Sequence, residues 1–323
     1  MSLQFIIGSS GIGKTHYACE QIIRESMENP QHLYYIIVPE QFTMQTQKNV
    51  VEMHPGKGIL NIDVLSFQRL AYRIFEETGG AREVLLDDTG KSMVLQKLVQ
   101  QHRKNLPYLG SQMNKPGYLD EVKSLISEFM QYDIREEELQ DMLGKTGEDS
   151  LLHMKMQDVG VLYQAFLQYL EGHYMTGEGV MDALKKAIPF SDKLKKSVLL
   201  LDGFTGFTPV QMNVIRELLN VCDKVLVTVT MDAGENPLQM GKPHQLFYMS
   251  RKMIHTLSGL TSNLDDPVLL KDERKGRFGN STSLDFLEKH LFRYRRSAYE
   301  KKQEEICIFA AESPVKELEE TAR

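Results

Sequence analysis

One octapeptide near the N-terminus, GSSGIGKT at Gly8–Thr15, constrains the fold more than any other feature of this sequence. It matches the pattern G-x-x-x-x-G-K-[ST], with the short apolar stretch Leu3–Ile7 before it and a helical pattern after it. Glycines let backbone N–H groups turn towards phosphate oxygens without side-chain clashes, and the start of the following helix adds a positive end. The sequence therefore predicts a strand, a phosphate-binding loop and a helix in that order.

The loop also supplies the predicted cofactor contacts. Its lysine can reach the β and γ phosphates of a nucleotide, and the hydroxyl that follows can ligate Mg²⁺. We expect ATP and Mg²⁺ here, with contacts from Gly8, Gly11, Gly13, Lys14 and Thr15. Two further GK[ST] tripeptides, Gly90–Ser92 and Gly144–Thr146, lack the first loop glycine and follow no strand signal, so we expect neither to bind phosphate.

Strand and helix signals alternate on both sides of a long central region. Apolar or β-branched runs predict strands, and one amphipathic run predicts a helix from Phe67 to about Glu77. The predicted strands are Leu33–Val38, about Ile59–Leu65, Val198–Leu201 and Lys224–Thr230. Such alternation is typical of an α/β protein with a parallel sheet. We predict a P-loop NTPase fold of the RecA-like type, built from residues 1–85 and 196–303.

The central region, residues 86–195, has a different character. It is rich in Glu, Lys, Gln and Leu, has turn signals at Pro107, Pro116–Gly117 and Gly144, and shows no clear strand. We predict an all-helical insertion domain there.

The C-terminal part begins with a polar, loop-like stretch, Ser258–Asn280. A helix is predicted at Leu284–Tyr294, ending in a basic cluster (Arg293, Arg295, Arg296) that we expect to be solvated. A strand at Ile306–Ala310 and a helix start near Ser313–Pro314 follow. A domain seldom ends in a new βα unit, so we expect residues 304–323 to begin a second RecA-like domain that is truncated.

Composition narrows the class of protein. No apolar run approaches the roughly 18 residues that span a membrane, and the N-terminus lacks the basic start of a signal peptide, so we expect a cytoplasmic protein without membrane contact. The three cysteines are far apart and form no C-x-x-C pair, which argues against a zinc ribbon or a disulfide framework. The net charge of −6 disfavours nonspecific duplex binding but allows a local groove for a single strand.

The apolar strand signal SVLLL ends at Asp202, which is where a metal-side (Walker B) carboxylate belongs. Asp202 is predicted to hold Mg²⁺ through water beside Thr15, and the alternative is a residue that only caps the next turn. ATPases of this kind usually place Glu directly after the Asp, but this chain has Gly203. General-base help contributes about 10²- to 10⁴-fold in rate, so we expect slow hydrolysis unless another carboxylate substitutes.

Four segments together resemble a known family: GSSGIGKT, IIVPEQFT, DVLSFQRLAY and LLLDGFTGFTPVQ. They are similar to the N-terminal region of AddB (RexB in some lactic bacteria), the second subunit of a bacterial helicase–nuclease that processes DNA double-strand breaks. Their order is that of a UvrD-like superfamily 1 helicase. The chain departs from active helicases where DGFTG, starting at Asp202, replaces D-E-x-Q-D, and motifs III and IV are not apparent.

The resemblance implies a helicase-like half that is not a working motor and that helps to read the recombination hotspot Chi in single-stranded DNA. It also implies an AddA-type partner subunit in a heterodimer. A nuclease domain with a 4Fe-4S cluster is expected only in a C-terminal part outside these residues, so we expect no nuclease activity here.

Loops after the sheet strands hold the single strand in helicases of this type. The expected DNA contacts in this chain are Gln41, Thr43, Phe67, Arg69, Tyr72, Phe204 and Phe207. Aromatic rings can stack on bases, and Arg or Gln can hold phosphates or read base edges. Each aromatic ring can instead belong to the core, and Phe67, Arg69 and Tyr72 would not share one helix face.

Three other functions remain open at this stage. They are an active ATP-driven helicase, a P-loop kinase for a small molecule, and a structural partner whose phosphate loop only stabilises the fold. The FTPVQ stretch after Asp202 fits the helicase family better than a kinase.

Overall fold

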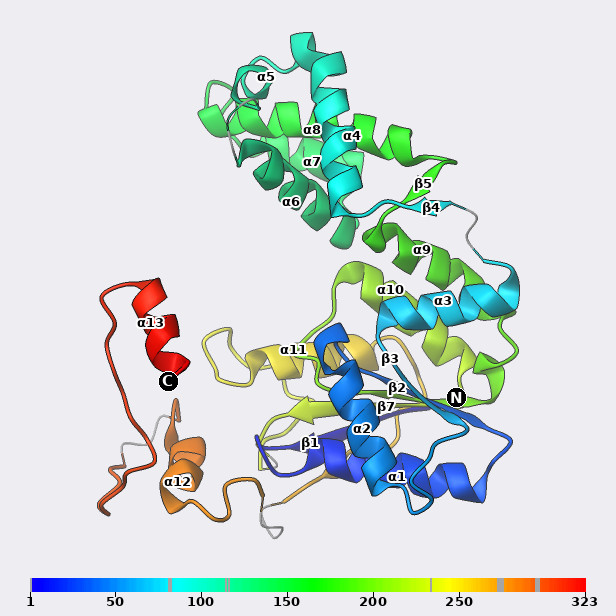
Figure 1. Ribbon diagram of the computed structural model, residues 1–323, viewed down its shortest axis with the longest axis vertical. Coiled ribbons are helices and arrows are strands. Elements are labelled where there is room, and N and C mark those ends of the chain that lie inside the picture. Colours follow the sequence, from blue (N-terminus) through cyan, green and yellow to red (C-terminus); the bar gives the residue numbers. More distant parts are fainter. Residues whose placement is uncertain are drawn as a thin grey trace.

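The computed structural model describes residues 2–80, 83–113, 115, 117–232, 234–271, 276–293 and 297–323. Figure 1 shows a sheet-containing part, here called the α/β body, and a separate group of helices, α4 to α8, here called the helical lobe. No helix in the described part of the chain has the length and apolar character needed to cross a bilayer.

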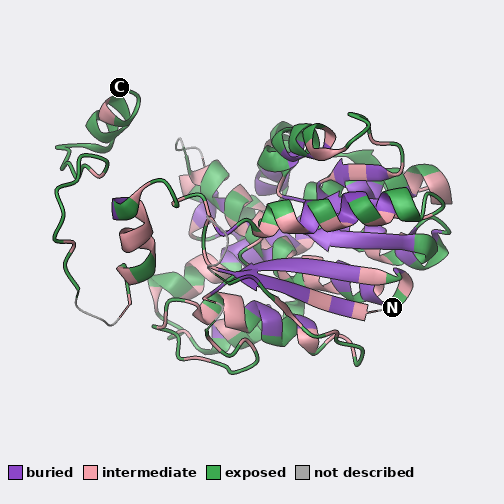
Figure 2. Ribbon diagram, turned by 90° about the horizontal axis from the view of Figure 1, so that it is seen from below, coloured by how far each residue is buried: buried purple, intermediate pink, exposed green. Residues whose placement is uncertain are grey.

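A six-stranded sheet forms the centre of the α/β body. Its order is β3-β2-β6-β7-β1-β8, and all neighbouring strands are parallel. The strands are β1 (Ser2–Gly8), β2 (Leu33–Ile37), β3 (Ile62–Leu65), β6 (Ser197–Leu201), β7 (Lys224–Thr230) and β8 (Val268–Leu269). The strands are largely buried between helices, as their continuous apolar sequences require (Figure 2). The prediction of an α/β fold with a parallel sheet is confirmed.

Helices cover both faces of this sheet. On one face lie α1 (Lys14–Glu28) and α2 (Thr43–Met53), and their apolar residues share one core with the strands. The layer on the other face consists of α3 (Phe67–Thr78), α9 (Gly177–Ala187), α10 (Pro209–Val221) and α11 (Tyr248–Ser258). Because all strands are parallel, the loops that follow their carboxyl ends gather at one edge of the sheet.

Local sequence signals set the ends of the helices in this layer. The Ser66 hydroxyl accepts the N–H of Arg69 at the start of α3, and Gly79, with φ 83°, ends that helix. Thr208 and Gln211 form a reciprocal capping box at the start of α10, where Pro209 occupies the first turn. The helix predicted from Phe67 to about Glu77 is therefore found one residue longer.

The helical lobe has a core of its own. It contains α4 (Asp88–His102), α5 (Leu109–Gln112), α6 (Tyr118–Gln131), α7 (Glu136–Gly144) and α8 (Leu151–Leu170). Leu98, Ile126 and Phe166 are among its buried residues. Two short parallel strands, β4 (Val84–Leu85) and β5 (Tyr174–Met175), join it to the body. The prediction of no strand in residues 86–195 is thus wrong at β5, because two residues are too few to show an alternating pattern.

Helix α9 lies within the predicted insertion but packs elsewhere. Its buried residues Val180 and Leu184 belong to the core of the α/β body, against α3 and α10. The separate helical core ends before Thr176, which caps α9. The division into residues 1–85 with 196–303 and residues 86–195 stays a prediction, and this packing favours a second boundary near Thr176 rather than at 195.

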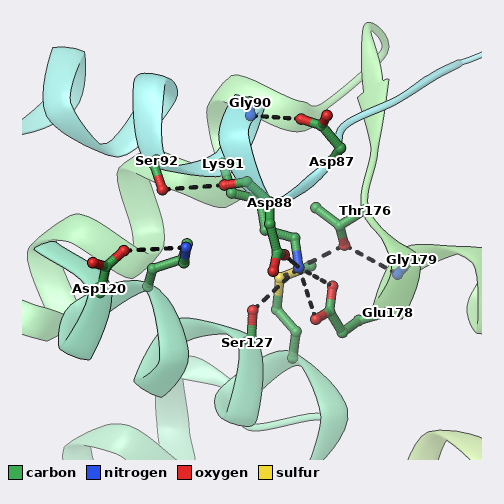
Figure 3. A network of polar contacts seen from close by, with 12 residues as sticks. Asp87, Asp88, Gly90, Lys91, Ser92, Asp120, Ser127, Thr176, Glu178 and Gly179 are labelled. Atoms are coloured by element: carbon green, nitrogen blue, oxygen red, sulfur yellow. Dashed lines mark hydrogen bonds and ion pairs between the residues drawn. The ribbon is translucent and has the colours of Figure 1, made fainter.

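A buried ion pair ties the lobe to the body (Figure 3). Lys91 on α4 donates to the carboxylate of Glu178 on α9 at 2.9 and 3.0 Å, and its Nζ lies 3.2 Å from the Ser127 hydroxyl. The two side chains are only 8% and 10% exposed. Lys91 is the lysine of the second GK[ST] tripeptide, so its amine is occupied by a structural contact between helices.

The C-terminal part differs from the sequence prediction in several places. The loop-like stretch contains β8, and the helix predicted at Leu284–Tyr294 is α12 (Thr282–His290). Residues 294–296, with two of the basic-cluster arginines, lie outside the described residues. The predicted strand Ile306–Ala310 is wrong: in the described part of the chain no strand pairs with it, and Ile308 is 95% exposed. The helix start near Ser313–Pro314 is confirmed by α13 (Pro314–Thr321). The assignment of residues 304–323 to a second domain stays a prediction.

Candidate functional site

The loop between β1 and α1 forms a tight turn at the carboxyl edge of the sheet. Gly11 has φ 75° and Gly13 has φ 98°, in the left-handed region that favours glycine. A Cβ on Gly8 would lie 2.6 Å from Cγ2 of Ile12. At each of these three positions, glycine is therefore required either by the backbone conformation or by the lack of space for a side chain.

Lys14 is the first residue of α1 and lies in the interior of this turn. Its Nζ donates to the carbonyl oxygen of Ser9 at 2.8 Å. Burial lowers the pKa of Lys14, while the carboxylates of Asp202 and Glu288 act in the opposite direction. A partly desolvated cation that donates to a neutral carbonyl gains from an anion beside it. The position suits a phosphate group.

Asp202 directly follows β6 and faces the phosphate loop. It is 6% exposed, and the Thr15 hydroxyl lies 3.1 and 2.9 Å from its two carboxylate oxygens. A hydroxyl and a carboxylate at this separation are the oxygen donors that Mg²⁺ takes, directly or through water. The two residues predicted to hold the metal are thus brought together, and the donor set fits Mg²⁺.

Thr228, a third residue beside Thr15 and Asp202, was not predicted from the sequence. The Thr228 hydroxyl donates to Oδ1 of Asp202 at 2.6 Å from the neighbouring strand β7. It is buried, and it fixes the orientation of the carboxylate. The available signal was a threonine inside the otherwise apolar strand KVLVTVT, which strand propensity alone explains equally well.

Gly203 stands where a hydrolytic carboxylate would be expected. It has φ 79°, and a Cβ there would lie 3.6 Å from Cδ of Pro39. Space for a side chain exists, but the left-handed backbone disfavours any residue other than glycine. A glutamate at this position would therefore strain the backbone.

A cavity of about 570 Å³ opens beside the loop. Gly11, Gly13, Lys14 and Thr15 line one side, and residues of α1, α2 and Arg277 line the rest. This volume lies within the range of about 300 to 1,000 Å³ found for small-molecule sites. Cavities of about 640 and 700 Å³ at the lobe–body junction and within the lobe are lined by none of the loop residues.

The expected DNA contacts lie at the same edge of the sheet as the phosphate loop. They follow β2, β3 and β6, which are neighbours in the sheet. Gln41 and the adjacent Phe42 are exposed, whereas Thr43 is buried and donates its hydroxyl to the carbonyl oxygen of Glu40. Arg69 is exposed and pairs with Glu40 at 3.0 Å. The loop after β2 is thus joined to the first turn of α3 by an ion pair.

The aromatic residues of this edge form a cluster. Phe67 is 5% exposed and packs at 5.6 Å between ring centroids from Phe204 and at 6.3 Å from Phe207. The last two rings are half-buried, and Tyr72 is exposed at its own position on α3. Phe67 thus supports the other two rings instead of presenting its own face.

A cluster of charged residues that lines a cavity together with Ser9 was also not predicted from the sequence. Arg293, expected to be solvated, has a side chain only 20% exposed and donates to Asp232 at 2.9 and 3.1 Å. Glu288 lies 3.6 Å from the same guanidinium, beside a cavity of about 440 Å³ that Ser9 also lines. Asp232 follows β7 and Glu288 lies on α12, so only the tertiary fold brings these two acids together.

Comparison with known proteins adds a family likeness to this geometry. Residues 5–288 match the family model described as "ADDB, N-terminal". The chain is similar to proteins named as the B component of an "ATP-dependent helicase/deoxyribonuclease". It is 43% identical to the one from Lachnoclostridium phytofermentans over 98% of this chain, and 32% identical to the one from Caldanaerobacter subterraneus over 100%. The relative from Clostridium acetobutylicum is also 32% identical over 100% of the chain. The chain spans 28% of the length of each of these relatives.

Proposed function

The chain belongs to the family of AddB N-terminal regions, and from that premise we propose that it is the ATP- and single-stranded-DNA-binding part of a bacterial helicase–nuclease subunit. The relatives are much longer than this chain, so their helicase and deoxyribonuclease activities enter as part of the proposal. The proposed role is in processing DNA double-strand breaks for recombination, including recognition of Chi.

One observation carries the nucleotide part of this proposal: the Thr15 hydroxyl lies within 3.1 Å of both Asp202 carboxylate oxygens, directly beside Lys14. Lys14 and the loop amides would hold the phosphates. Thr15 and, through water, Asp202 would hold Mg²⁺, which offsets phosphate charge. Thr228 keeps the Asp202 carboxylate turned towards this position.

We further propose that this site binds ATP without driving a motor. Gly203 offers no side chain to orient an attacking water, and general-base help is worth about 10²- to 10⁴-fold in rate. Bound ATP would then act as a structural ligand that stabilises the loop edge of the sheet.

The DNA part of the proposal uses the edge formed by the loops after β2, β3 and β6. The exposed or half-buried side chains would contact the strand, namely Gln41, Arg69, Tyr72, Phe204 and Phe207. Thr43 and Phe67 are buried and would hold these loops in place. Stacking contributes about 1–3 kcal/mol per base, so this short aromatic cluster suits a few unpaired nucleotides.

The remaining expectations concern the larger assembly. We propose an AddA-type subunit as partner in a heterodimer and the cytoplasm as location. A nuclease domain with a 4Fe-4S cluster would belong to the part of the longer relatives that this chain does not span.

Strand binding tests the proposal directly. The full-length protein with its partner subunit is mixed with Chi-like and scrambled single-stranded oligonucleotides, with and without ATP. We expect tighter binding of the Chi-like strand, strengthened by ATP and weakened by Arg69→Ala or Tyr72→Ala. If the wild type and both variants bound the two oligonucleotides equally well, the proposed role in DNA reading would be wrong.

One observation supports an active ATPase as the second candidate. Glu288 and Ser9 line the same cavity, and Ser9 accepts the hydrogen bond of Lys14, so another carboxylate lies on the side of the phosphate loop. Turnover stimulated by single-stranded DNA and abolished by Lys14→Ala would favour this candidate.

A further inference from the structure

Three residues from the C-terminal part of the chain lie against the outside of the phosphate loop. The backbone N–H of Arg277 donates to the carbonyl oxygen of Gly11 at 2.8 Å. A Cβ on Gly276 would lie 2.9 Å from the same oxygen, and a Cβ on Gly11 would lie 3.0 Å from the ring of Phe278. We call Gly276–Phe278 the strap. Its contact with the loop is so close that glycine is needed on both sides.

Arg277 is one of the residues that line the cavity beside Lys14 and Thr15. Within the described part of the chain, its guanidinium makes no hydrogen bond and no ion pair. Three other arginines of the α/β body pair with carboxylates: Arg69 with Glu40, Arg73 with Asp63 and Arg251 with Glu235. Among the described residues, the Arg277 guanidinium thus has no competing carboxylate partner, and its residue borders the cavity.

The charge of the cavity favours an anionic ligand at this point. Among the described residues that line the cavity, Lys14 is the only cation of the lysine or arginine type besides Arg277. The acidic lining residue, Glu52, lies 3.8 Å from the ammonium group of Lys48. A nucleotide triphosphate carries more negative charge than one lysine neutralises. A guanidinium can bind phosphate oxygens through two parallel hydrogen bonds, which an ammonium cannot do.

From this arrangement we propose that the strap is part of the nucleotide site and that the Arg277 guanidinium is a second phosphate-binding cation beside Lys14. The proposal rests on the nucleotide-binding function proposed above and adds a residue to it. The hydrogen bond to Gly11 fixes the main chain of Arg277 on the loop. The Arg277 side chain therefore starts from a fixed point on the phosphate loop, and the proposal is that its guanidinium extends from there to the phosphates.

Nucleotide affinity tests this assignment. Binding of a non-hydrolysable ATP analogue, ADP and AMP to the full-length protein is measured with Mg²⁺ present. Arg277→Ala keeps the backbone N–H but removes the guanidinium, and we expect it to weaken binding of the ATP analogue by about 10- to 100-fold, the size of a charged hydrogen bond. The affinity of Arg277→Lys for the ATP analogue should fall between those of the wild type and Arg277→Ala. The lysine keeps the charge but cannot donate two parallel hydrogen bonds. AMP binding should change least.

A matched control and a second variant make the outcome unambiguous. Arg216→Ala removes an exposed arginine on α10, on the other face of the sheet, and should leave all three affinities unchanged. Wild-type affinity of Arg277→Ala for the ATP analogue would overturn the assignment, as would an equal loss for AMP and the analogue. Lys14→Ala separates the two proposals: if it binds nucleotide as well as wild type, or if wild type binds none, the nucleotide function itself is wrong.

Discussion

Lys14 and Lys91 stand in the same local sequence, glycine before them and a hydroxyl residue after them, yet the fold gives them opposite surroundings. Lys14 follows a strand and a loop, donates to a neutral carbonyl and faces a cavity. Lys91 lies inside α4 and donates to the Glu178 carboxylate between two helices. The tripeptide alone thus has no fixed function, because its chemistry depends on the element that precedes it.

The electrostatic states of the two lysines differ accordingly. Burial lowers the pKa of Lys14, so its charge is held at a cost until an anion arrives. Burial raises the pKa of Glu178, but the hydrogen bond from Lys91, a backbone hydrogen bond, the charge of Lys91 and the Thr176 hydroxyl together hold this pKa below its usual value. Among the described residues, Lys14 thus bonds to a neutral carbonyl only, whereas Lys91 is already paired with a carboxylate.

The largest effect is expected at the structural lysine. Lys91→Ala leaves Glu178 as an unpaired buried charge, and the free energy of unfolding should fall by about 3–5 kcal/mol. Denaturant unfolding measures this loss. The double variant Lys91→Met with Glu178→Leu is the control, because apolar replacement of both partners should restore most of the stability. A single-variant loss under about 1 kcal/mol would contradict the buried-pair interpretation.

The next effect is expected at the ligand-facing lysine and should appear in binding alone. Lys14→Met would remove the proposed contact to two phosphates, so ATP affinity should fall by about 100-fold or more. The free energy of unfolding without nucleotide should stay the same or rise slightly, since a desolvated charge is lost. Titration with ATP and denaturant unfolding separate these readouts. A large loss of stability in Lys14→Met would end the contrast with Lys91.

A smaller effect is expected beside Asp202. Gly203→Glu restores the usual carboxylate to a position with φ 79°, so it should lower stability by about 1–2 kcal/mol. Because the backbone would aim this side chain differently from a regular strand end, ATP turnover should not increase. Gly206→Glu is the control, since a Cβ there meets nothing within 4 Å and its φ is not positive. A marked rise in turnover for Gly203→Glu alone would show that only the missing carboxylate prevents hydrolysis.

The smallest effect is expected at the third GK[ST] lysine. Lys145 pairs with Asp141 at 2.6 Å, but both side chains are largely exposed. Lys145→Ala should therefore change the free energy of unfolding by no more than about 0.5 kcal/mol and leave ATP affinity unchanged. A loss comparable to that of Lys91→Ala would mean that exposure does not explain the difference between these lysines.

Much of the α/β body could be predicted from the sequence. The strand before the phosphate loop, the strand Lys224–Thr230 and helix α3 were found close to their predicted bounds, because each has a strong local pattern and a clear cap or stop. Local patterns could not predict the two-residue strand β5, and they wrongly predicted a strand at Ile306–Ala310. A strand exists only where another strand supplies hydrogen bonds, and that partner is not encoded locally.

The sequence by itself determined the order of strand, loop and helix, the need for glycines in the loop, and the meeting of Thr15 with Asp202 at one edge of a parallel sheet. These follow from local conformation and from the rule that parallel strands end together. Only the tertiary structure decided which lysine meets a carboxylate, that Thr228 orients Asp202, that Phe67 is buried, and that the strap lies on Gly11. Those contacts join residues far apart in the chain, so burial and partner choice are fixed by packing and not by any local pattern.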